Sequence, residues 1–118
     1  MSKIVVLTGS PREKGNSFAM TEAFIKAAEE KGHSVTRFDT DKLTVGPCHA
    51  CETCYKTGEA CSFADDFNAI APAVLDADVI VFSTPVYWYS IPAQLKSVLD
   101  KMYSFCVAGK DKAGKGCA

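Results

Sequence analysis

Short apolar runs alternate with longer amphipathic segments along this chain. Ile4–Leu7 and Val79–Phe82 are continuous apolar runs, and each is followed by a turn sequence rich in Ser, Thr and Pro. This pattern is typical of strands buried on both faces of a parallel sheet. Val35–Phe38 mixes apolar and polar residues, which suits a strand at a sheet edge. We therefore predict three strands.

Between these strands, apolar residues recur at helical spacing. The first predicted helix begins at Asn16 or Ser17, either of which can cap it, and the second follows Asp65 or Asp66. Residues 91–102 present one apolar face of a third helix. The alternation of strands and helices predicts an α/β fold with a doubly wound parallel sheet and right-handed crossovers.

Composition narrows the class of protein. The chain has 118 residues, 47% of them hydrophobic, and its 13 basic and 14 acidic residues give a net charge of −1. This length suits a single domain over residues 1–118, and the charge balance argues against a nucleic-acid binder. No apolar run is long enough to cross a membrane or to serve as a signal peptide. We therefore expect a cytoplasmic protein with no membrane partner.

The loop after the first strand has the composition of a phosphate site. Its sequence, Gly9 to Ser17, lacks the lysine of a Walker A motif and the second glycine of G-x-G-x-x-G. It does bring hydroxyls, an amide and Arg12 to the start of a helix, where free N–H groups favour an anion. A plain turn with an Asn16 cap is the alternative interpretation.

The loop after the third strand carries three aromatic residues, Tyr87, Trp88 and Tyr89. In a doubly wound sheet this loop and the one after the first strand both lie at the carboxyl ends of the strands, where ligands bind. Large rings in a loop can simply cover a core. Beside a phosphate site, they also suit a flat heteroaromatic ligand.

Two motifs together resemble one family. Gly-Ser-Pro-Arg-x-x-Gly-Asn-Ser after the first strand and Thr-Pro-Val-Tyr-Trp-Tyr-Ser after the third are similar to those of the NAD(P)H-dependent FMN reductases, which are flavodoxin-like. The resemblance implies an FMN phosphate site formed by Ser10, Arg12, Gly15, Asn16 and Ser17. It implies that the isoalloxazine ring is bordered by Pro85, Val86, Tyr87 and Trp88. It also implies that the cofactor performs the redox chemistry, so no catalytic side chain is predicted.

The segment 46–62 is rich in cysteine. Cys48, Cys51, Cys54 and Cys61 fall within fourteen residues, and in a reducing compartment such clusters indicate metal binding or redox chemistry. The spacing suffices for the four thiolates of a [4Fe-4S] cluster and resembles that of the iron-sulfur flavoproteins of the same family. Zinc and free redox thiols are the alternatives. Cys106 and Cys117 are expected to be a small core residue and a terminal thiol.

The resemblance also implies more strands than the chain supplies. A flavodoxin-like sheet has five strands in the order 2-1-3-4-5, and only the first three are recognised here, in the order 2-1-3. Lys115–Ala118 resembles the first residues of a fourth strand. We therefore expect an incomplete domain with an open edge on the third strand, and a homo-oligomer as one consequence.

The sequence thus predicts an FMN-dependent oxidoreductase. Electrons would pass from NAD(P)H or a reduced carrier through FMN, and through a [4Fe-4S] cluster, to a small-molecule or protein acceptor. A flavin-only FMN or quinone reductase is one alternative. A non-catalytic zinc-binding or thiol-sensing module on the same scaffold is the other.

Overall fold

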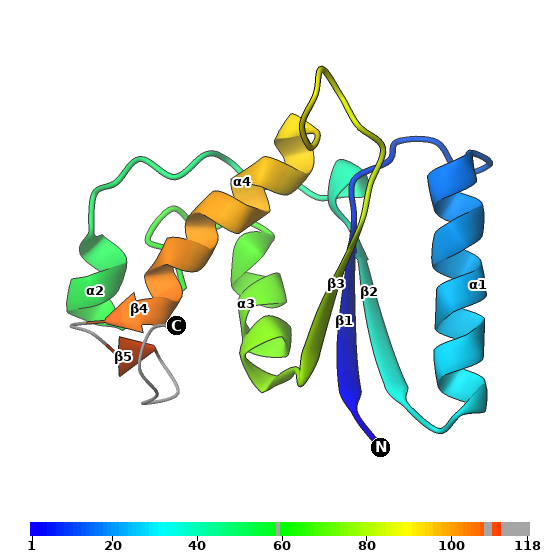
Figure 1. Cartoon of the computed structure of the whole chain (residues 1–118). Helices are drawn as coiled ribbons and strands as arrows, with labels where there is room; N and C mark the ends of the chain where they lie inside the picture. The colour runs from blue at the N-terminus through cyan, green and yellow to red at the C-terminus, as the bar shows by residue number, and fades with distance from the viewer. Residues whose placement is uncertain (59, 108–109, 112–118) are drawn as a thin grey trace.

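A parallel sheet forms the centre of the molecule (Figure 1). The computed structural model describes residues 1–58, 60–107 and 110–111, with the backbone alone at 106, 107, 110 and 111. Strands β1 (Lys3–Thr8), β2 (Ser34–Asp39) and β3 (Val79–Ser83) are arranged in the order β2-β1-β3, and both pairings are parallel. This confirms the predicted α/β class and strand order.

The connecting elements follow in chain order. They are α1 (Asn16–Glu30), the 3-10 turn η1 (Thr40–Lys42), α2 (Thr53–Thr57), α3 (Phe67–Asp76), α4 (Ala93–Lys101), η2 (Met102–Phe105) and a hairpin of β4 (Cys106–Val107) and β5 (Lys110–Asp111). The sequence pattern did not predict η1, α2 or the hairpin.

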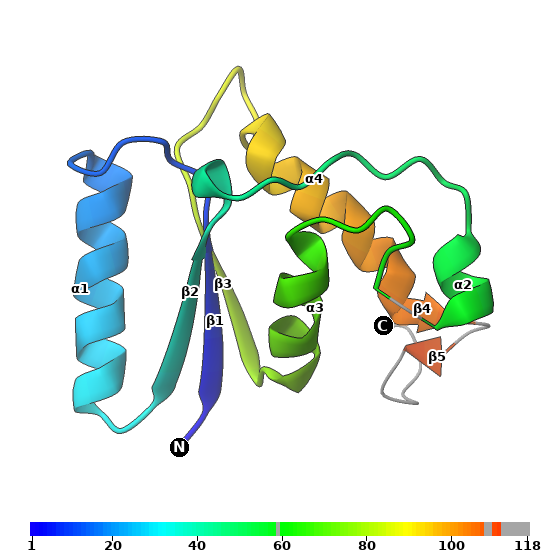
Figure 2. The same ribbon diagram turned by 180° about the vertical axis from the view of Figure 1, so that it is seen from behind.

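Helices cover both faces of the sheet because alternate side chains of β1 point to opposite sides. Val5 and Leu7 pack in one core cluster with Phe67 of α3 and Leu95 of α4. Ile4 and Val6, which alternate with Val5 and Leu7 along β1, belong to a second cluster with residues of α1. Figure 2 shows α1 on one side of the sheet and α3 with α4 on the other. The fold is therefore doubly wound, as predicted.

The starts of the helices differ in part from the predicted ones. Gly15, not Asn16 or Ser17, is the N-cap of α1, and no side chain caps that helix. At α3, Asp65 Oδ1 accepts the N–H of Phe67 at 2.9 Å. The predicted fourth-strand segment Lys115–Ala118, with Cys117, lies outside the described residues, as does the side chain of Cys106.

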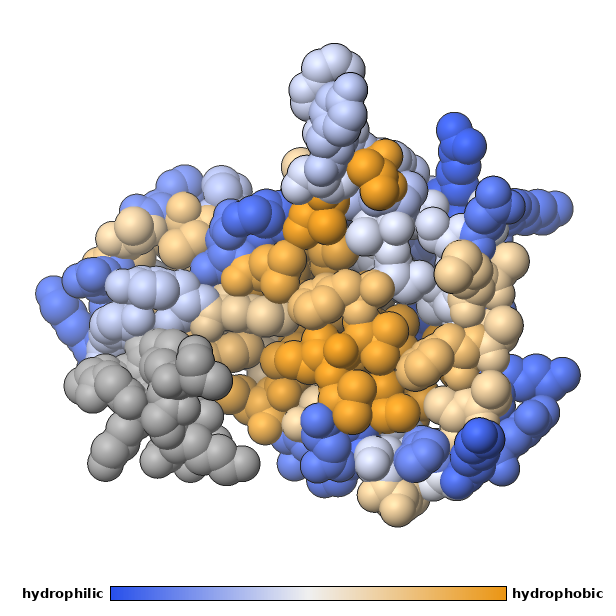
Figure 3. All heavy atoms as spheres, in the orientation of Figure 1, coloured by the Kyte–Doolittle hydropathy of each residue, from blue (hydrophilic) through white to orange (hydrophobic). Residues whose placement is uncertain are grey.

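Strand β3 pairs only with β1 in the described part of the chain. Val79, Ile80 and Phe82 are 44%, 38% and 45% exposed. Figure 3 shows apolar side chains gathered over this strand. Within the described residues, the outer edge of β3 thus has no strand partner and exposes apolar side chains, as expected.

Candidate functional site

A pocket of about 310 Å³ lies where the β1–α1 loop approaches the β3–α4 loop. Both loops lie at the carboxyl ends of their strands (Figure 1). The residues that line the pocket are Ser10, Arg12, Gly15, Asn16, Ser17, Pro85 and Tyr87. Residues far apart in sequence, each chosen for a phosphate or a flat ring, therefore face one cavity.

The part of this pocket formed by the β1–α1 loop presents a cation and a helix start that no described side chain caps. The backbone N–H of Arg12 donates to Ser10 Oγ at 3.2 Å, which orders the loop, while the Arg12 side chain is exposed. Among the residues the structure describes, no carboxylate pairs with Arg12. Since no side chain caps α1, its first N–H groups lack that partner too. The arrangement suits an anionic ligand.

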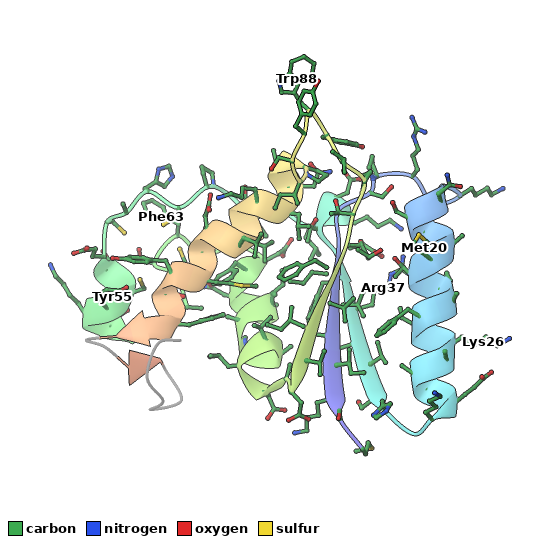
Figure 4. All side chains as sticks on the ribbon, viewed as in Figure 1. Met20, Lys26, Arg37, Tyr55, Phe63 and Trp88 are labelled. Carbon is green, nitrogen blue, oxygen red and sulfur yellow. The ribbon has the colours of Figure 1, made fainter. Side chains whose placement is uncertain are left out.

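The aromatic loop contains a strained turn. Tyr87 and Ser90 exchange backbone hydrogen bonds of 2.8 and 3.1 Å, and the two residues between them, Trp88 and Tyr89, have φ values of 45° and 67°. Left-handed backbone is costly for residues with a Cβ. Trp88 is 91% exposed and points away from the molecule (Figure 4). Val86 is 76% exposed, and neither Val86 nor Trp88 lines the pocket.

Gly9, Thr21 and Thr84 hold these loops in place, and none of them is among the predicted site residues. A Cβ on Gly9 would lie 2.4 Å from Thr84 Oγ1, so only glycine lets the two loops approach this closely. Buried Thr21 Oγ1 lies 2.8 Å from Ser17 O and 2.7 Å from Ser83 Oγ, which joins α1 to β3. The position of Gly9 directly after a buried strand is the one signal that the sequence offered.

The end of β2 is closed by ion pairs beside the pocket. Asp39 accepts hydrogen bonds from Thr8 Oγ1 at 2.7 Å and Arg37 Nε at 2.8 Å. Burial raises the pKa of Asp39, but these bonds outweigh it and hold the pKa below its ordinary value. Arg37 also pairs with Glu22 and lies 4.8 Å from the ring centroid of Phe18. The charged groups of Glu22, Arg37 and Asp39 therefore pair with one another. None of these three residues lines the 310 Å³ pocket between the β1–α1 and β3–α4 loops.

The four cysteines of segment 46–62 line a second pocket. It is small, about 30 Å³, and residues of the cysteine segment and of the C-terminal end of α4 line it. Figures 1 and 2 both show α2 near that end of α4. Cys48 and Cys51 are exposed, whereas Cys54 and Cys61 are half-buried. No three His, Cys, Asp or Glu side chains in the described residues are grouped so as to hold a metal ion.

Polar groups of the cysteine pocket suit anionic sulfur. Hydrogen bonds from Thr53 and Ser62 lower the pKa of Cys51, which favours the thiolate that binds metals. The buried side chains of Lys101 and Ser104 line the same pocket, and Ser104 Oγ has no hydrogen-bond partner among the residues that the structure describes. Four thiols with a cation and an unused hydroxyl fit the chemistry of a thiolate-bound iron-sulfur cluster.

Comparison with known proteins identifies the relatives of this chain. The sequence profile of the NADPH-dependent FMN reductase family matches residues 2–115. Two iron-sulfur flavoproteins of Archaeoglobus fulgidus are 36% identical over 108 residues and 32% identical over 103 residues. Those alignments cover 92% and 87% of this chain and 54% and 46% of the relatives, so the chain spans about half their length.

A solved structure shows the same fold. The NAD(P)H:quinone oxidoreductase from Methanothermobacter marburgensis superposes with a TM-score of 0.73 at 22% identity, over 92% of this chain and 58% of the other. No helix in the described residues has both the length and the apolar character needed to span a bilayer. The resemblance seen in the two loop motifs is confirmed, and the chain belongs to the NADPH-dependent FMN reductase family, in the branch whose curated members are named iron-sulfur flavoproteins.

Proposed function

We propose that this protein binds FMN between the β1–α1 and β3–α4 loops and acts as an oxidoreductase that takes electrons from NAD(P)H or a reduced carrier. The observation that carries the proposal is the 310 Å³ pocket, which brings both family motifs to one cavity. Family membership supports the same cofactor.

The loop after β1 supplies the phosphate contacts in this proposal. Arg12 provides a cation that no described carboxylate neutralises, and charge-assisted hydrogen bonds are the strongest that such a loop can form. Ser10, Asn16 and Ser17 add polar groups beside the uncapped start of α1. Together they neutralise and orient a phosphate dianion.

The loop after β3 supplies the wall of the ring site. Pro85 and Tyr87 line the pocket and present apolar surface to a flat ligand. Val86 and Trp88, the other two predicted ring residues, are exposed and do not line the pocket. FMN held in this pocket would supply hydride and single-electron transfer. The work of the protein is to hold and orient the ring, and no side chain is required as nucleophile or general base.

We further propose that Cys48, Cys51, Cys54 and Cys61 hold a [4Fe-4S] cluster. All four line one pocket, and curated relatives covering most of the chain are named iron-sulfur flavoproteins. Held by these thiolates, such a cluster would supply one-electron transfer. The final acceptor is then a small molecule or protein that accepts electrons from this pair, and we expect the protein to work in the cytoplasm.

Cofactor analysis after anaerobic purification tests both proposals. We expect FMN together with iron and acid-labile sulfide. Yellow protein with FMN and no iron would refute the cluster and support the flavin-only reductase. Colourless protein with one zinc would refute both proposals and support the non-catalytic zinc-binding module. FMN titration of apoprotein gives the affinity directly and does not depend on the cluster.

A further inference from the structure

Lys101 is a charged side chain placed in the interior beside the cysteines. It is 3% exposed, and its Nζ lies 2.6 Å from Asp65 Oδ2. A lysine ammonium has three N–H donors, and Asp65 is the one acceptor that the described residues provide. Lys101 also lines the pocket that the four cysteines line. The remaining donors are available to an occupant of that pocket.

Ser104 adds a second unused donor to the same wall. Its side chain belongs to η2, one turn beyond Lys101, and the residue is 3% exposed. Its Oγ is buried, and none of the described residues forms a hydrogen bond with it. Buried hydroxyls are nearly always satisfied, so an unsatisfied one in the lining of a pocket points to a missing ligand. A ligand that accepts hydrogen bonds fits both Ser104 and Lys101.

Asp65 fixes this wall to the cysteine segment. Its Oδ2 accepts the backbone N–H of Gly46 at 2.9 Å as well as the Lys101 ammonium, and its Oδ1 accepts the N–H of Phe67. One carboxylate therefore joins the start of the cysteine segment, the start of α3 and the end of α4. The Lys101 charge cannot leave the pocket without breaking this junction.

We propose that Lys101 and Ser104 donate hydrogen bonds to the sulfur atoms of the anionic cluster held by the four cysteines, and that Asp65 positions Lys101 for this contact. The inference rests on the proposed cluster and adds two residues that tune it. Sulfur atoms of a thiolate-bound cluster carry negative charge and accept hydrogen bonds, and such bonds stabilise the reduced, more negative state. The two donors should therefore raise the reduction potential of the cluster.

The Ser104 variants test the hydroxyl. In Ser104→Ala we expect full iron and sulfide content with a lower midpoint potential, and Ser104→Thr, which keeps a hydroxyl, should restore the potential. Apoprotein carrying Ser104→Ala should unfold at the same temperature as the parent or higher, because an unsatisfied buried group has been removed. Ser97→Ala is the matched control, since Ser97 Oγ lies 3.1 Å from Ala93 O and does not line the pocket.

The charge is tested in a paired variant. Lys101→Met alone would leave Asp65 buried without its partner, so Lys101→Met is combined with Asp65→Asn, whose amide oxygen can still accept a backbone N–H. We expect this double variant to retain FMN and to show a cluster potential lower than that of Asp65→Asn alone.

The outcomes separate this inference from the proposed function. Parent protein without iron and sulfide would refute the cluster itself. The role of Lys101 and Ser104 would be refuted, with the cluster left in place, if the potential in Ser104→Ala equals that of the parent and of Ser97→Ala, and the potential of the double variant equals that of Asp65→Asn alone. A water molecule that satisfies Ser104 would produce this second outcome.

Discussion

Gln94 Nε2 donates a 2.8 Å hydrogen bond to the backbone carbonyl of Gly9. This bond joins the start of α4 to the loop after β1, beside the proposed flavin site. The other end of α4 is Lys101, in the wall of the cysteine pocket. One helix therefore connects the loop of the proposed flavin site to the wall of the cysteine pocket, and polar side chains fix its two ends.

Replacing Arg12 by Ala should weaken FMN binding by about 2 kcal/mol, or about 30-fold in Kd, because a charge-assisted contact to the phosphate is lost. Asn16→Ala should weaken binding less, since it removes a neutral group. Fluorescence titration measures both. Lys14→Ala is the control, because Lys14 is an exposed cation of the same loop that does not line the pocket. Parent-like binding by both Arg12→Ala and Asn16→Ala would refute the phosphate assignment.

Replacing any one of Cys48, Cys51, Cys54 and Cys61 by Ala should remove iron and sulfide and leave FMN bound, since the two pockets have no lining residue in common. Metal, sulfide and flavin analysis of each purified variant checks this. Cys117→Ala serves as the control and should change none of the three. A full iron complement in two of the four variants would rule out the ligand set.

Gly9→Ala should destabilise the fold by about 1–3 kcal/mol through overpacking, because the new Cβ would meet Thr84 Oγ1 at 2.4 Å. Gly15→Ala is the matched comparison. Its Cβ would lie 3.5 Å from the nearest atom, which is ordinary contact, and Gly15 has a φ of −87° that any residue adopts. Thermal unfolding should rank Gly9→Ala well below Gly15→Ala, and equal stabilities would contradict the close approach of the two loops.

The Asp65 carboxylate should make stability depend on acid pH. Burial raises its pKa, but the bonds from Lys101 and the backbone N–H groups of Gly46 and Phe67 outweigh burial and hold the pKa below the ordinary 3.8. Because the folded-state pKa is depressed, the stabilisation is present above about pH 4 and is lost as pH falls through the folded-state value. In Asp65→Asn, denaturant unfolding should show a smaller loss of stability between pH 5 and pH 2 than in the parent. An identical slope would contradict this role.

The homo-oligomer stays a prediction, and the edge of β3 is where we expect it to form. Sedimentation of the parent should show mass that rises with concentration, because Val79, Ile80 and Phe82 expose apolar surface on an open edge. Phe82→Lys should reduce this association. Met20→Lys is the control and should leave the association unchanged, because Met20 is a 72% exposed residue of α1. A parent that sediments as a monomer at every concentration would exclude association through this edge.

The sheet could be predicted because parallel strands of this class carry unbroken apolar runs, and Ile4–Leu7 and Val79–Phe82 are such runs. Burial on both faces is confirmed for the first run alone, since no described strand pairs with the outer edge of β3 and Val79, Ile80 and Phe82 are partly exposed. The cap of α1 could not. The sequence does not distinguish an Asn16 that caps the helix from an Asn16 that faces a ligand, and the structure has Gly15 at the cap. Helix α2 is five residues long, too short to show a period.

The candidate sites were predicted in part for a similar reason. Local motifs identified the residues of the two loops, but which of them share a cavity depends on the turn at Trp88, which directs that ring outward. Lys101 and Ser104 carry no motif. Their place beside the cysteines depends on Asp65, 36 positions away from Lys101 in the sequence, and on where α4 ends.

A connection that only reversed direction between Tyr87 and Ser90 would be more stable with Asn-Gly at its centre, the pair best suited to left-handed backbone. This chain has Trp88 and Tyr89 there, at about 1–2 kcal/mol of strain for each residue, with both rings about 90% exposed. Thermostability engineering would select this turn for replacement. The same replacement would remove the two largest exposed aromatic surfaces of the loop, so a gain in melting temperature here would come with a loss of contact area for another molecule.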